Sequence, residues 1–454
     1  MQLIAIIDIG KTNAKLVLVE SQSGREVFQA KRSNTSRETA LGRQLDIAGI
    51  EQWLLEALRS TPLTAQVAAI VPIAHGATAV LIDGHGAVVA APDYEDPRFE
   101  TINADYERER DAFAATFSPS LPLGLNLARQ LYYLQVRAPD VSARTAHILL
   151  YPQYWAWRFS GVLASEVTSL GCHTDLWRPR EATFSQLAHS HGWSRTFPAL
   201  RQARETLGTI TPQIAAATGL NPDCRVVCGI HDSNASYLEH LLDRSREQPF
   251  AVISSGTWTI VMANRGNLTR LREERDMLAN VDAFGAPVAT ARFMGGREYE
   301  AIARTTVRPD IAALESVVQQ SGYALPSFAD AGPFPAARGV LLGAERFNEA
   351  ERAALATLYA ALMSDLLLES LEASGDVLID GPLAANPLFA PLLAAWHPQA
   401  QVFGNAGAGG VCARAARYLA GFDTAPAISG PAPPPLNVPH LDAYRQTWRA
   451  QLPR

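Results

Sequence analysis

The stretch that decides the fold runs from Leu3 to Val19 and reads LIAIIDIGKTNAKLVLV. Two apolar runs enclose a short polar turn, the pattern of two antiparallel strands joined by a tight turn. Gly10, Thr12 and Asn13 in that turn are residue types that leave backbone N–H groups free to point at an anion. Asp8, at the end of the first run, could hold a divalent cation through water, as Mg-nucleotide chemistry requires. An aspartate that merely starts the turn explains this motif equally well when it is taken alone.

Length and composition predict an ordinary globular protein with two domains. The 454 residues exceed one comfortable core, and 48% hydrophobic with 19% charged residues is typical of folded chains. A formal net charge of -6 gives no basic field, so no nucleic-acid partner is expected. The N-terminus shows no leader pattern and no run of 18 apolar residues occurs, so we expect a cytoplasmic protein without membrane association.

The four cysteines indicate neither a disulfide scaffold nor a zinc site. They are Cys172, Cys224, Cys228 and Cys412, and only the middle two lie close together, without a second pair nearby. Buried thiols are the expected state.

Three segments of the first half could supply a pocket. A loop between two predicted strands contains His75 and Gly76, although a satisfied loop histidine is the simpler interpretation of His75 alone. Asn126 stands near the start of a helix predicted over 125–135. A buried strand over 224–229 leads to His231 and Asp232, whose carboxylate could act as a general base or could simply cap the next helix.

The second half repeats the opening pattern. A polar stretch over 243–249 suggests a domain boundary, and a strand, a turn with Ser255, Gly256 and Thr257, and another strand follow it. Gly295 and Gly296 then precede a helix, where their lack of side chains lets the backbone approach a ligand closely. We predict one domain over 1–245, a second over 246–424, and a Pro-rich C-terminal tail over 425–454.

The order of these motifs resembles the FGGY family of carbohydrate kinases. The likeness extends from Leu3 to about Ala420, with the hairpins at 8–15 and 254–257 similar to the family's two phosphate hairpins. The segment 231–236 is similar to the one with the family's catalytic aspartate, 293–296 to its glycine turn, and 381–386 to its adenosine motif. The resemblance implies an α/β fold with two RNase H-like (actin-type) domains and a nucleotide cleft between them.

The resemblance also implies ATP and Mg²⁺ as cofactors and a small-molecule sugar as substrate. It makes Asp232 the catalytic base and Asp8 and Asp232 the metal-binding residues. The implied sugar-binding residues are His75, Gly76, Asn126, His231 and Asp232. The implied nucleotide-binding residues are Gly10, Lys11, Thr12, Asn13, Ser255, Gly256, Thr257, Gly295, Gly296, Gly381 and Asn386.

Two features resemble the rhamnulokinase and fuculokinase subfamilies, namely the loop at His75 and the pair His231-Asp232. They imply transfer of the γ-phosphate to a primary hydroxyl, O1, of a ketose such as L-rhamnulose or L-fuculose. The alternatives are another FGGY substrate (a pentulose or polyol), a non-catalytic sugar- or nucleotide-binding protein, and an ATPase on the same fold. A homodimer stays open as the oligomeric state.

The chain departs from the family pattern at three places, and at one of them, residues 339–362, the family's second signature is only partly kept. Lys11 stands where the family usually has a small hydroxyl residue, which would add a cation beside the phosphates. Pro382 and Leu383 follow Gly381 in a motif that is usually glycine-rich, which bears on nucleotide affinity and base preference.

Overall fold

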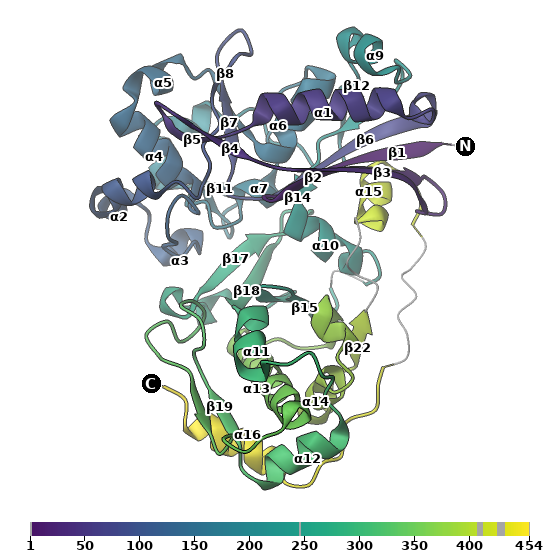
Figure 1. Ribbon diagram of the computed structural model, residues 1–454. Helices are drawn as coiled ribbons and strands as arrows, with labels where there is room; N and C mark the ends of the chain where they lie inside the picture. Colours follow the sequence, from purple (N-terminus) through teal and green to yellow (C-terminus); the bar gives the residue numbers. More distant parts are fainter. Residues whose placement is uncertain (1, 245–246, 406–411, 425–431, 454) are drawn as a thin grey trace. The chain divides into compact units, whose positions relative to one another are not determined.

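The computed structural model describes residues 2–244, 247–405, 412–424 and 432–453, and they form two compact units (Figure 1). The first unit contains the described residues of Met1–Asp243, Ala279–Pro287 and Val411–Pro426, and the second those of Arg244–Leu278, Val288–Gly410 and Ala427–Arg454. The sequence suggests a single boundary near 245, whereas each unit is discontinuous in the chain. Hydrophobic periodicity does not indicate where the chain leaves one unit and later re-enters it.

The first unit is built on a sheet of seven strands with the order β12-β13-β6-β1-β2-β3, in which β14 also pairs with β6. The predicted hairpin is present as β1 and β2, and β1 pairs in parallel with β6 on its other side. Because this central strand is covered on both faces, nearly all its side chains are buried. The strands are β1 (Leu3–Ile9), β2 (Asn13–Glu20), β3 (Glu26–Ser33), β6 (Val67–Ala74), β12 (Thr206–Thr209), β13 (Arg225–Val227) and β14 (Ile230–His231).

Two helices of the first unit show how its sequence specifies local structure. Helix α1 (Ile47–Ser60) buries apolar residues that recur at helical spacing, and the Asp46 side chain caps it by accepting from the Gly49 amide. Helix α6 (Tyr151–Ser160) ends at Gly161, whose φ of 75° favours glycine. The other helices are α2 (Asn103–Glu109), α3 (Phe113–Thr116), α4 (Leu127–Arg137), α5 (Pro139–Arg144), α7 (Val167–Leu170), α8 (Gln186–Ser190), α9 (Pro212–Thr218), α10 (Asp232–Leu241) and α15 (Ala413–Leu419).

Smaller sheets complete the first unit. A three-stranded sheet has the order β8-β7-β9, and its buried residues share a second apolar core with α4. Two strand pairs, β4-β5 and β10-β11, lie apart from the larger sheets. These strands are β4 (Ser36–Thr39), β5 (Gly42–Leu45), β7 (Ala79–Ile82), β8 (Val88–Ala90), β9 (His147–Leu150), β10 (Trp177–Arg178) and β11 (Thr183–Phe184).

The second unit repeats the central topology of the first. Its six-stranded sheet has the order β17-β18-β16-β15-β21-β22. The hairpin β15-β16 is antiparallel, as predicted, and β15 pairs in parallel with β21, just as β1 pairs with β6. The strands are β15 (Phe250–Ser255), β16 (Thr259–Ala263), β17 (Met277–Val281), β18 (Pro287–Phe293), β21 (Asp376–Asp380) and β22 (Val402–Asn405), with a separate pair β19 (Tyr323–Leu325) and β20 (Val340–Leu342).

Five helices belong to the second unit, and one of them forms its core. Within the described residues, α13 is the single helix long and apolar enough to cross a membrane by length and composition, but 83% of its most apolar window is buried inside the protein. Packing in a core therefore accounts for its composition. The helices are α11 (Gly295–Ala303), α12 (Ile311–Gln319), α13 (Glu349–Ser370), α14 (Phe389–Trp396) and α16 (Leu441–Ala450).

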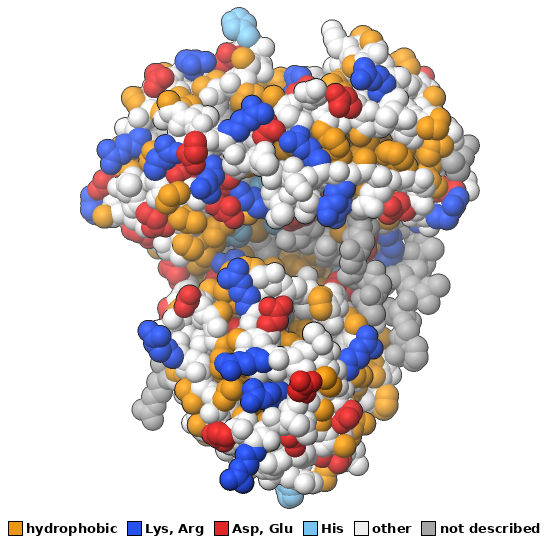
Figure 2. All heavy atoms as spheres, in the orientation of Figure 1, with side chains coloured by type: hydrophobic (Ala, Val, Ile, Leu, Met, Phe, Trp, Pro, Cys, Tyr) orange, Lys and Arg blue, Asp and Glu red, His pale blue; other side chains and the backbone are white. Residues whose placement is uncertain are grey.

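The surface carries charges of both signs. Lys/Arg and Asp/Glu side chains are intermixed on the visible face (Figure 2).

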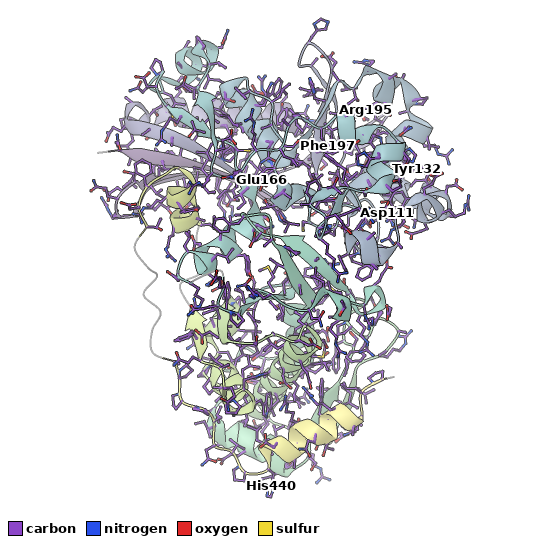
Figure 3. The ribbon with its side chains drawn as sticks, turned by 180° about the vertical axis from the view of Figure 1, so that it is seen from behind. Asp111, Tyr132, Glu166, Arg195, Phe197 and His440 are labelled. Carbon is purple, nitrogen blue, oxygen red and sulfur yellow. The ribbon has the colours of Figure 1, made fainter. Side chains whose placement is uncertain are left out.

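The C-terminal stretch contains a helix that the sequence analysis does not predict. Helix α16 begins after His440 (Figure 3) and buries Tyr444 and Trp448 in the second unit. The indole of Trp448 donates to the Ala324 carbonyl over 2.7 Å, and Arg445 forms two hydrogen bonds to the buried Asp365. This helix is therefore part of the core of the second unit.

Replacing Trp448 by alanine should destabilise the second unit by about 3–5 kcal/mol, because it leaves a cavity and an unsatisfied carbonyl. Calorimetry of the full chain would measure this as a lower melting temperature. Thr447→Ala, an exposed position of the same helix, is the control. Equal melting temperatures for the two variants would contradict the role of α16 in the core.

Candidate active site

Two carboxylates stand at the carboxyl ends of strands on either side of β6. Both β1 and β14 run parallel to β6, and Ile9 and His231 are in register with the same residue, Ala74. Asp8 and Asp232 therefore lie at one edge of the sheet, with backbones about 10 Å apart, two strand spacings. Burial is the main reason why the pKa of Asp8 is raised, and the charge of Asp232 adds to it.

Lys15 is the cation beside this pair of carboxylates. It faces Asp8 in the register of the β1-β2 hairpin, and its Nζ donates to Asp8 Oδ2 over 3.3 Å. Sequence reasoning missed Lys15. The signal was present, because counting back from the turn of a two-stranded hairpin places these two residues opposite each other.

The turn between β1 and β2 is held in shape by Asn34. The Asn34 side-chain amide donates to the Gly10 carbonyl over 2.7 Å, and its backbone N–H donates to the Thr12 carbonyl over 2.8 Å. Inside the turn, the Gly10 amide donates to Asn13 O over 2.9 Å. The backbone N–H groups of Lys11 and Thr12 have no acceptor among the described residues. The turn can therefore offer two amides to an anion, as predicted.

The Lys11 side chain is engaged with a loop of the same unit. Its Nζ forms an ion pair with Asp93, lies 3.3 Å from Glu95 Oε2, and is 4.9 Å from the centroid of the Tyr94 ring. The sequence analysis assigned Lys11 to the nucleotide and did not single out Asp93 or Glu95. Two carboxylates and an aromatic face make a better environment for an ammonium group than an open turn does.

Asp232 is oriented by its neighbours. Asp232 Oδ1 accepts from the Ser233 amide over 2.6 Å and lies 3.2 Å from His231 Nε2. The Asn234 side-chain amide donates to His231 Nδ1 over 3.1 Å, which assigns the ring proton to Nε2 and makes that nitrogen a donor to Asp232. Among the described residues nothing bonds to Asp232 Oδ2. The side chain is 38% exposed, so this oxygen is open to a substrate.

The protonation states fit a base at Asp232. Burial raises the pKa of Asp232, while the nearby His75 and the bonds from Ser233 lower it by less. Burial also lowers the pKa of His231 to about 4, so that its ring is neutral near pH 7. A carboxylate with a raised pKa is a stronger base. The alternative that Asp232 caps the helix is not supported, because His231 occupies the N-cap position of α10.

A buried glutamate supports the short strand that precedes Asp232. The Thr168 hydroxyl accepts from the His231 backbone N–H over 3.1 Å and donates to Glu166. Glu166 is fully buried within the first unit (Figure 3), and its Oε1 has no hydrogen-bond partner among the described residues. Burial raises the pKa of Glu166 to about 7. Sequence reasoning missed this residue, since nothing in its local pattern marks it.

His75 and Gly76 lie against the same site. His75 is 8% exposed, and its ring packs edge-on against Tyr94 and Tyr151. Its Nδ1 lies 3.0 Å from the Gly76 carbonyl, which can only accept, so the proton is on Nδ1 and Nε2 is an acceptor. A Cβ atom on Gly76 would lie 2.7 Å from His231 Nε2. Gly76 therefore makes room for the ring that orients Asp232.

Asn126 does not fit the role of a sugar ligand. It is fully buried, its Oδ1 accepts from the Leu121 amide over 2.9 Å, and its Nδ2 donates to the carbonyls of Pro119 and His173. These bonds use the whole amide to hold two backbone segments together. The expectation from the sequence is corrected on this point, because a side chain with satisfied donors and acceptor has nothing left for a substrate.

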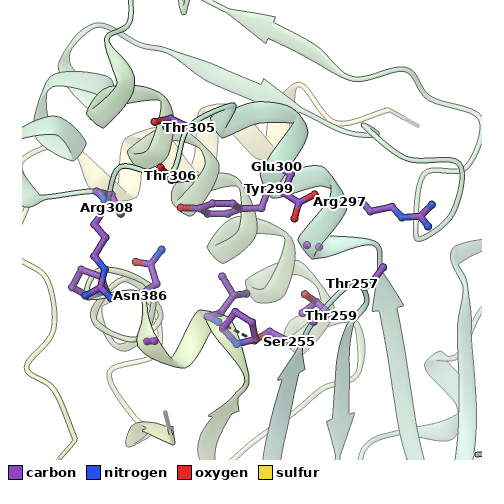
Figure 4. Close-up of a pocket in the computed structure, with 18 of the residues that line it drawn as sticks. Ser255, Thr257, Thr259, Arg297, Tyr299, Glu300, Thr305, Thr306, Arg308 and Asn386 are labelled. Carbon is purple, nitrogen blue, oxygen red and sulfur yellow. Dashed lines mark hydrogen bonds between the residues drawn. The ribbon is translucent and has the colours of Figure 1, made fainter. Parts of the chain in front are cut away.

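The second unit contains its own pocket, with a volume of about 670 Å³ (Figure 4). Its walls come from the β15-β16 turn, the start of α11 and the segment after β21. The amides of Gly256 and Thr257 have no acceptor among the described residues. Predicted residues that line this pocket are Ser255, Gly256, Thr257, Gly295, Gly296 and Asn386. A free-amide turn beside a helix N-terminus suits a phosphate.

Glycines at this pocket and next to it let two backbone segments approach each other closely. A Cβ atom on Gly296 would collide with the Gly256 carbonyl oxygen, and one on Gly381, whose φ is 79°, would collide with the Ser255 carbonyl. Ser255 itself links two elements, since its hydroxyl donates to the Asp380 carbonyl and accepts from the Leu383 amide. Gly296 thus lets the hairpin turn come close to the start of α11, and the close approach of a ligand at the glycine pair stays a prediction.

Asn386 is fixed in the wall of this pocket. Its Nδ2 donates to the Thr357 hydroxyl over 2.9 Å, and its Oδ1 accepts from the Leu388 amide over 3.0 Å. Pro382 and Leu383, the departure from the glycine-rich pattern, begin a short 3₁₀ turn that also lines the pocket. The segment with Pro382 and Leu383 therefore still forms part of the wall of this pocket.

Family models match both units. "FGGY family of carbohydrate kinases, N-terminal domain" matches residues 3–238, and "Carbohydrate kinase FGGY, C-terminal domain" matches residues 247–427. The chain belongs to the FGGY family of carbohydrate kinases. The predicted α/β fold with two actin-type domains is confirmed by this membership and by the structures of FGGY kinases that the chain resembles.

Individual FGGY kinases extend this comparison. The L-fuculokinase of Escherichia coli (strain K12) is 26% identical over 270 residues, which cover 58% of this chain and 56% of that protein. The chain thus matches little more than half the length of that relative. A crystal structure of a carbohydrate kinase from Novosphingobium aromaticivorans has a TM-score of 0.90 with 35% identity, covering 99% of both chains. A xylulose kinase from Lactobacillus acidophilus, at 15% identity, shares the fold with a TM-score of 0.78 over 99% of this chain and 97% of that one.

Replacing Gly296 by alanine should weaken Mg-ADP binding to this FGGY protein at least about tenfold, since the new methyl group displaces the turn that holds Gly256. Isothermal titration calorimetry would measure the dissociation constant. Gly84→Ala is the control, because a Cβ atom there meets no neighbour within 4 Å. Unchanged binding by the Gly296 variant would remove this turn from the nucleotide site.

Replacing Glu166 by glutamine should make stability less dependent on pH. The pKa of Glu166 is raised from 4.5 to about 7 in the folded protein, so wild type loses stability as the pH rises from about 4.5 to 7 and no more above it. The variant's gain should therefore be small at pH 5 and approach about 3 kcal/mol above pH 7. Melting temperatures from pH 5 to 8, with the exposed Glu181→Gln as control, would measure it. A gain independent of pH would contradict the raised pKa.

Proposed function

We propose that this protein is a cytoplasmic, ATP-dependent sugar kinase. It transfers the γ-phosphate to a primary hydroxyl, O1, of a ketose such as L-rhamnulose or L-fuculose. The similarity to the L-fuculokinase of E. coli supports this substrate class. The pair His231-Asp232 and the loop at His75, in which the resemblance to that subfamily lies, come together in the first unit.

The observation that carries the proposal is the state of Asp232. One carboxylate oxygen is held by the Ser233 amide and the neutral His231, and the other is free among the described residues. Such a carboxylate can accept the proton of a hydroxyl group at Oδ2 while its orientation stays fixed. His75 Nε2, a buried acceptor nearby, can accept a hydrogen bond from another hydroxyl of the same sugar.

The residues at this edge of the sheet fit a magnesium ion. Mg²⁺ is usually bound by one or two carboxylates together with waters and substrate phosphates. Asp8 and Asp232 supply those carboxylates, and the described residues contain no group of three or more metal-ligating side chains that would form a closed site. When bound, the ion would neutralise charge on the phosphates.

In the proposed reaction Asp232 takes the proton from the sugar hydroxyl as its oxygen bonds to the γ-phosphorus. The bond between that phosphorus and the β-phosphate oxygen breaks, and ADP leaves. The free amides of Lys11 and Thr12 in the first unit are suited to an anion such as a phosphate, and so, separately, are those of Gly256 and Thr257 in the second unit. Positioning and charge neutralisation supply most of the acceleration, because the transition state is loose.

A panel assay tests this function. ADP release from MgATP would be measured with L-rhamnulose, L-fuculose, ribuloses, xyluloses, erythritol and glycerol, and without sugar. A saturable rise with a 6-deoxyketose supports the proposal, and a rise with another compound moves the substrate to a pentulose or polyol. Hydrolysis without sugar dependence indicates an ATPase. Nucleotide binding without turnover indicates a binding protein, and either of these two results overturns the proposal.

Replacing Asp232 by asparagine should abolish transfer without unfolding the protein. Because burial raises the pKa of Asp232, its ionised form costs stability near pH 7, and this cost disappears as the pH falls toward 3.8. We therefore expect an equal or higher melting temperature at pH 7, with the gain shrinking at acid pH. Asp223→Asn, at an exposed position, should change neither property. Retained transfer would refute Asp232 as the base.

A further inference from the structure

A cavity of about 450 Å³ lies beside the β1-β2 turn, and all its lining residues belong to the first unit. We call it the Lys11 pocket. Lys11, His75, Asp93 and Glu95 line it, together with Asn34 and Ser36. The volume is in the range of sites for small molecules.

Three consecutive loop residues surround the Lys11 ammonium group. Asp93 and Glu95 pair with it, and the Tyr94 ring lies beneath it at 4.9 Å. The Lys11 side chain is 21% exposed and that of Asp93 only 2%. Removing the cation would leave the Asp93 carboxylate buried without its charge partner, which is costly.

Asp93 fixes this loop to its neighbours. Its carboxylate accepts from the Ser36 hydroxyl and from the Glu95 amide, and its own amide donates to the Arg43 carbonyl over 2.9 Å. Burial raises the pKa of Asp93, but the bonds from Lys11, Ser36 and the Glu95 amide outweigh this, and the net pKa is lowered. Asp93 is thus an ionised structural centre, whereas the Glu95 side chain is 50% exposed.

His75 marks the pocket as a place for a ligand. Its Nε2 acceptor has no partner among the described residues although the side chain is more than nine-tenths buried. Its ring contacts Tyr94 with centroids 5.7 Å apart, so the histidine and the loop around Lys11 form one wall. An unpartnered acceptor and an exposed carboxylate on one wall suit a ligand with several hydroxyl groups.

We propose that Lys11 is a positioning residue of the sugar pocket and not a phosphate ligand. This inference rests on the proposed kinase function. Lys11 holds the loop of residues 93–95 so that Glu95 and His75 receive the sugar's hydroxyl groups, while the phosphates meet only the backbone amides of the turn. The lysine at this position therefore sets sugar affinity and leaves nucleotide affinity unchanged.

Steady-state kinetics of Lys11→Met test the proposal. We expect the KM for the sugar to rise about tenfold while the KM for MgATP stays within about twofold. Asp93→Asn should give the same pattern, and the double variant should add little, because both remove one interaction. Lys31→Met, at an exposed position of β3, is the matched control. A rise in the KM for MgATP with an unchanged KM for the sugar would overturn the proposal.

A labelling experiment on the wild-type protein does not depend on how the variants fold. Of the 39 lysines and arginines only three are lysines, Lys11, Lys15 and Lys31, so mass spectrometry can follow acylation of each amine separately. L-fuculose and L-rhamnulose alone should slow the acylation of Lys11 relative to Lys31, and Mg-ADP alone should not. Protection by Mg-ADP and not by either sugar would overturn the proposal.

The two proposals can fail separately. If no panel sugar is phosphorylated by wild type, the kinase function fails, whatever happens at Lys11. If a sugar is phosphorylated but the Lys11 variant alters only the KM for MgATP, the kinase function stands and the role of Lys11 fails.

Discussion

The parallel pairing of β1 and β14 with the same strand, β6, is the constraint on which the first unit's chemistry depends. The pairing places Asp8 and Asp232 at one edge of the sheet, because Ile9 and His231 are both in register with Ala74. A slip by one residue would turn every side chain of a strand to the opposite face. The nearly complete burial of β1 prevents such a slip, so the apolar run before Asp8 fixes the position of the carboxylate.

The second unit has the same topology as the first, but other residues hold its hairpin turn in shape. Its hairpin turn meets the start of α11 at Gly296 and the turn after β21 at Gly381, and a side chain at either glycine would collide with a backbone carbonyl of the hairpin. The first unit closes its turn with Asn34 instead. Both solutions leave amides of the turn without acceptors among the described residues, which is the property that an anion site requires.

Much of the fold and about half of the site could be predicted from the sequence. The hairpins, α1 and the end of α6 follow from local patterns of period two or 3.6 and from glycine at a left-handed position. Asp8 and Asp232 stand where apolar strands end, so their places could be predicted too. Lys15 was accessible through hairpin register, although the sequence analysis did not use it.

The remaining residues depend on contacts between segments far apart in the chain. Glu166 reaches His231 through Thr168, and Lys11 reaches Asp93 across 82 positions. Asn126 shows the opposite error: its amide type suggested a ligand, but three backbone groups use it completely, and one of them, the His173 carbonyl, is 47 positions away. The local sequence does not show which side chains meet in the fold. The roles of these residues therefore cannot be predicted from the sequence alone.

The position of Lys11 shows why a motif residue can change while the motif keeps its function. A phosphate hairpin works through backbone N–H groups, which every residue except proline supplies, so its side chains can serve another purpose. In this chain the side chain of one turn residue joins the loop of residues 93–95, while the amides of the same turn remain without acceptors among the described residues. Under the proposed function the backbone of the hairpin meets the nucleotide, while its lysine acts on the sugar only by positioning the loop of residues 93–95.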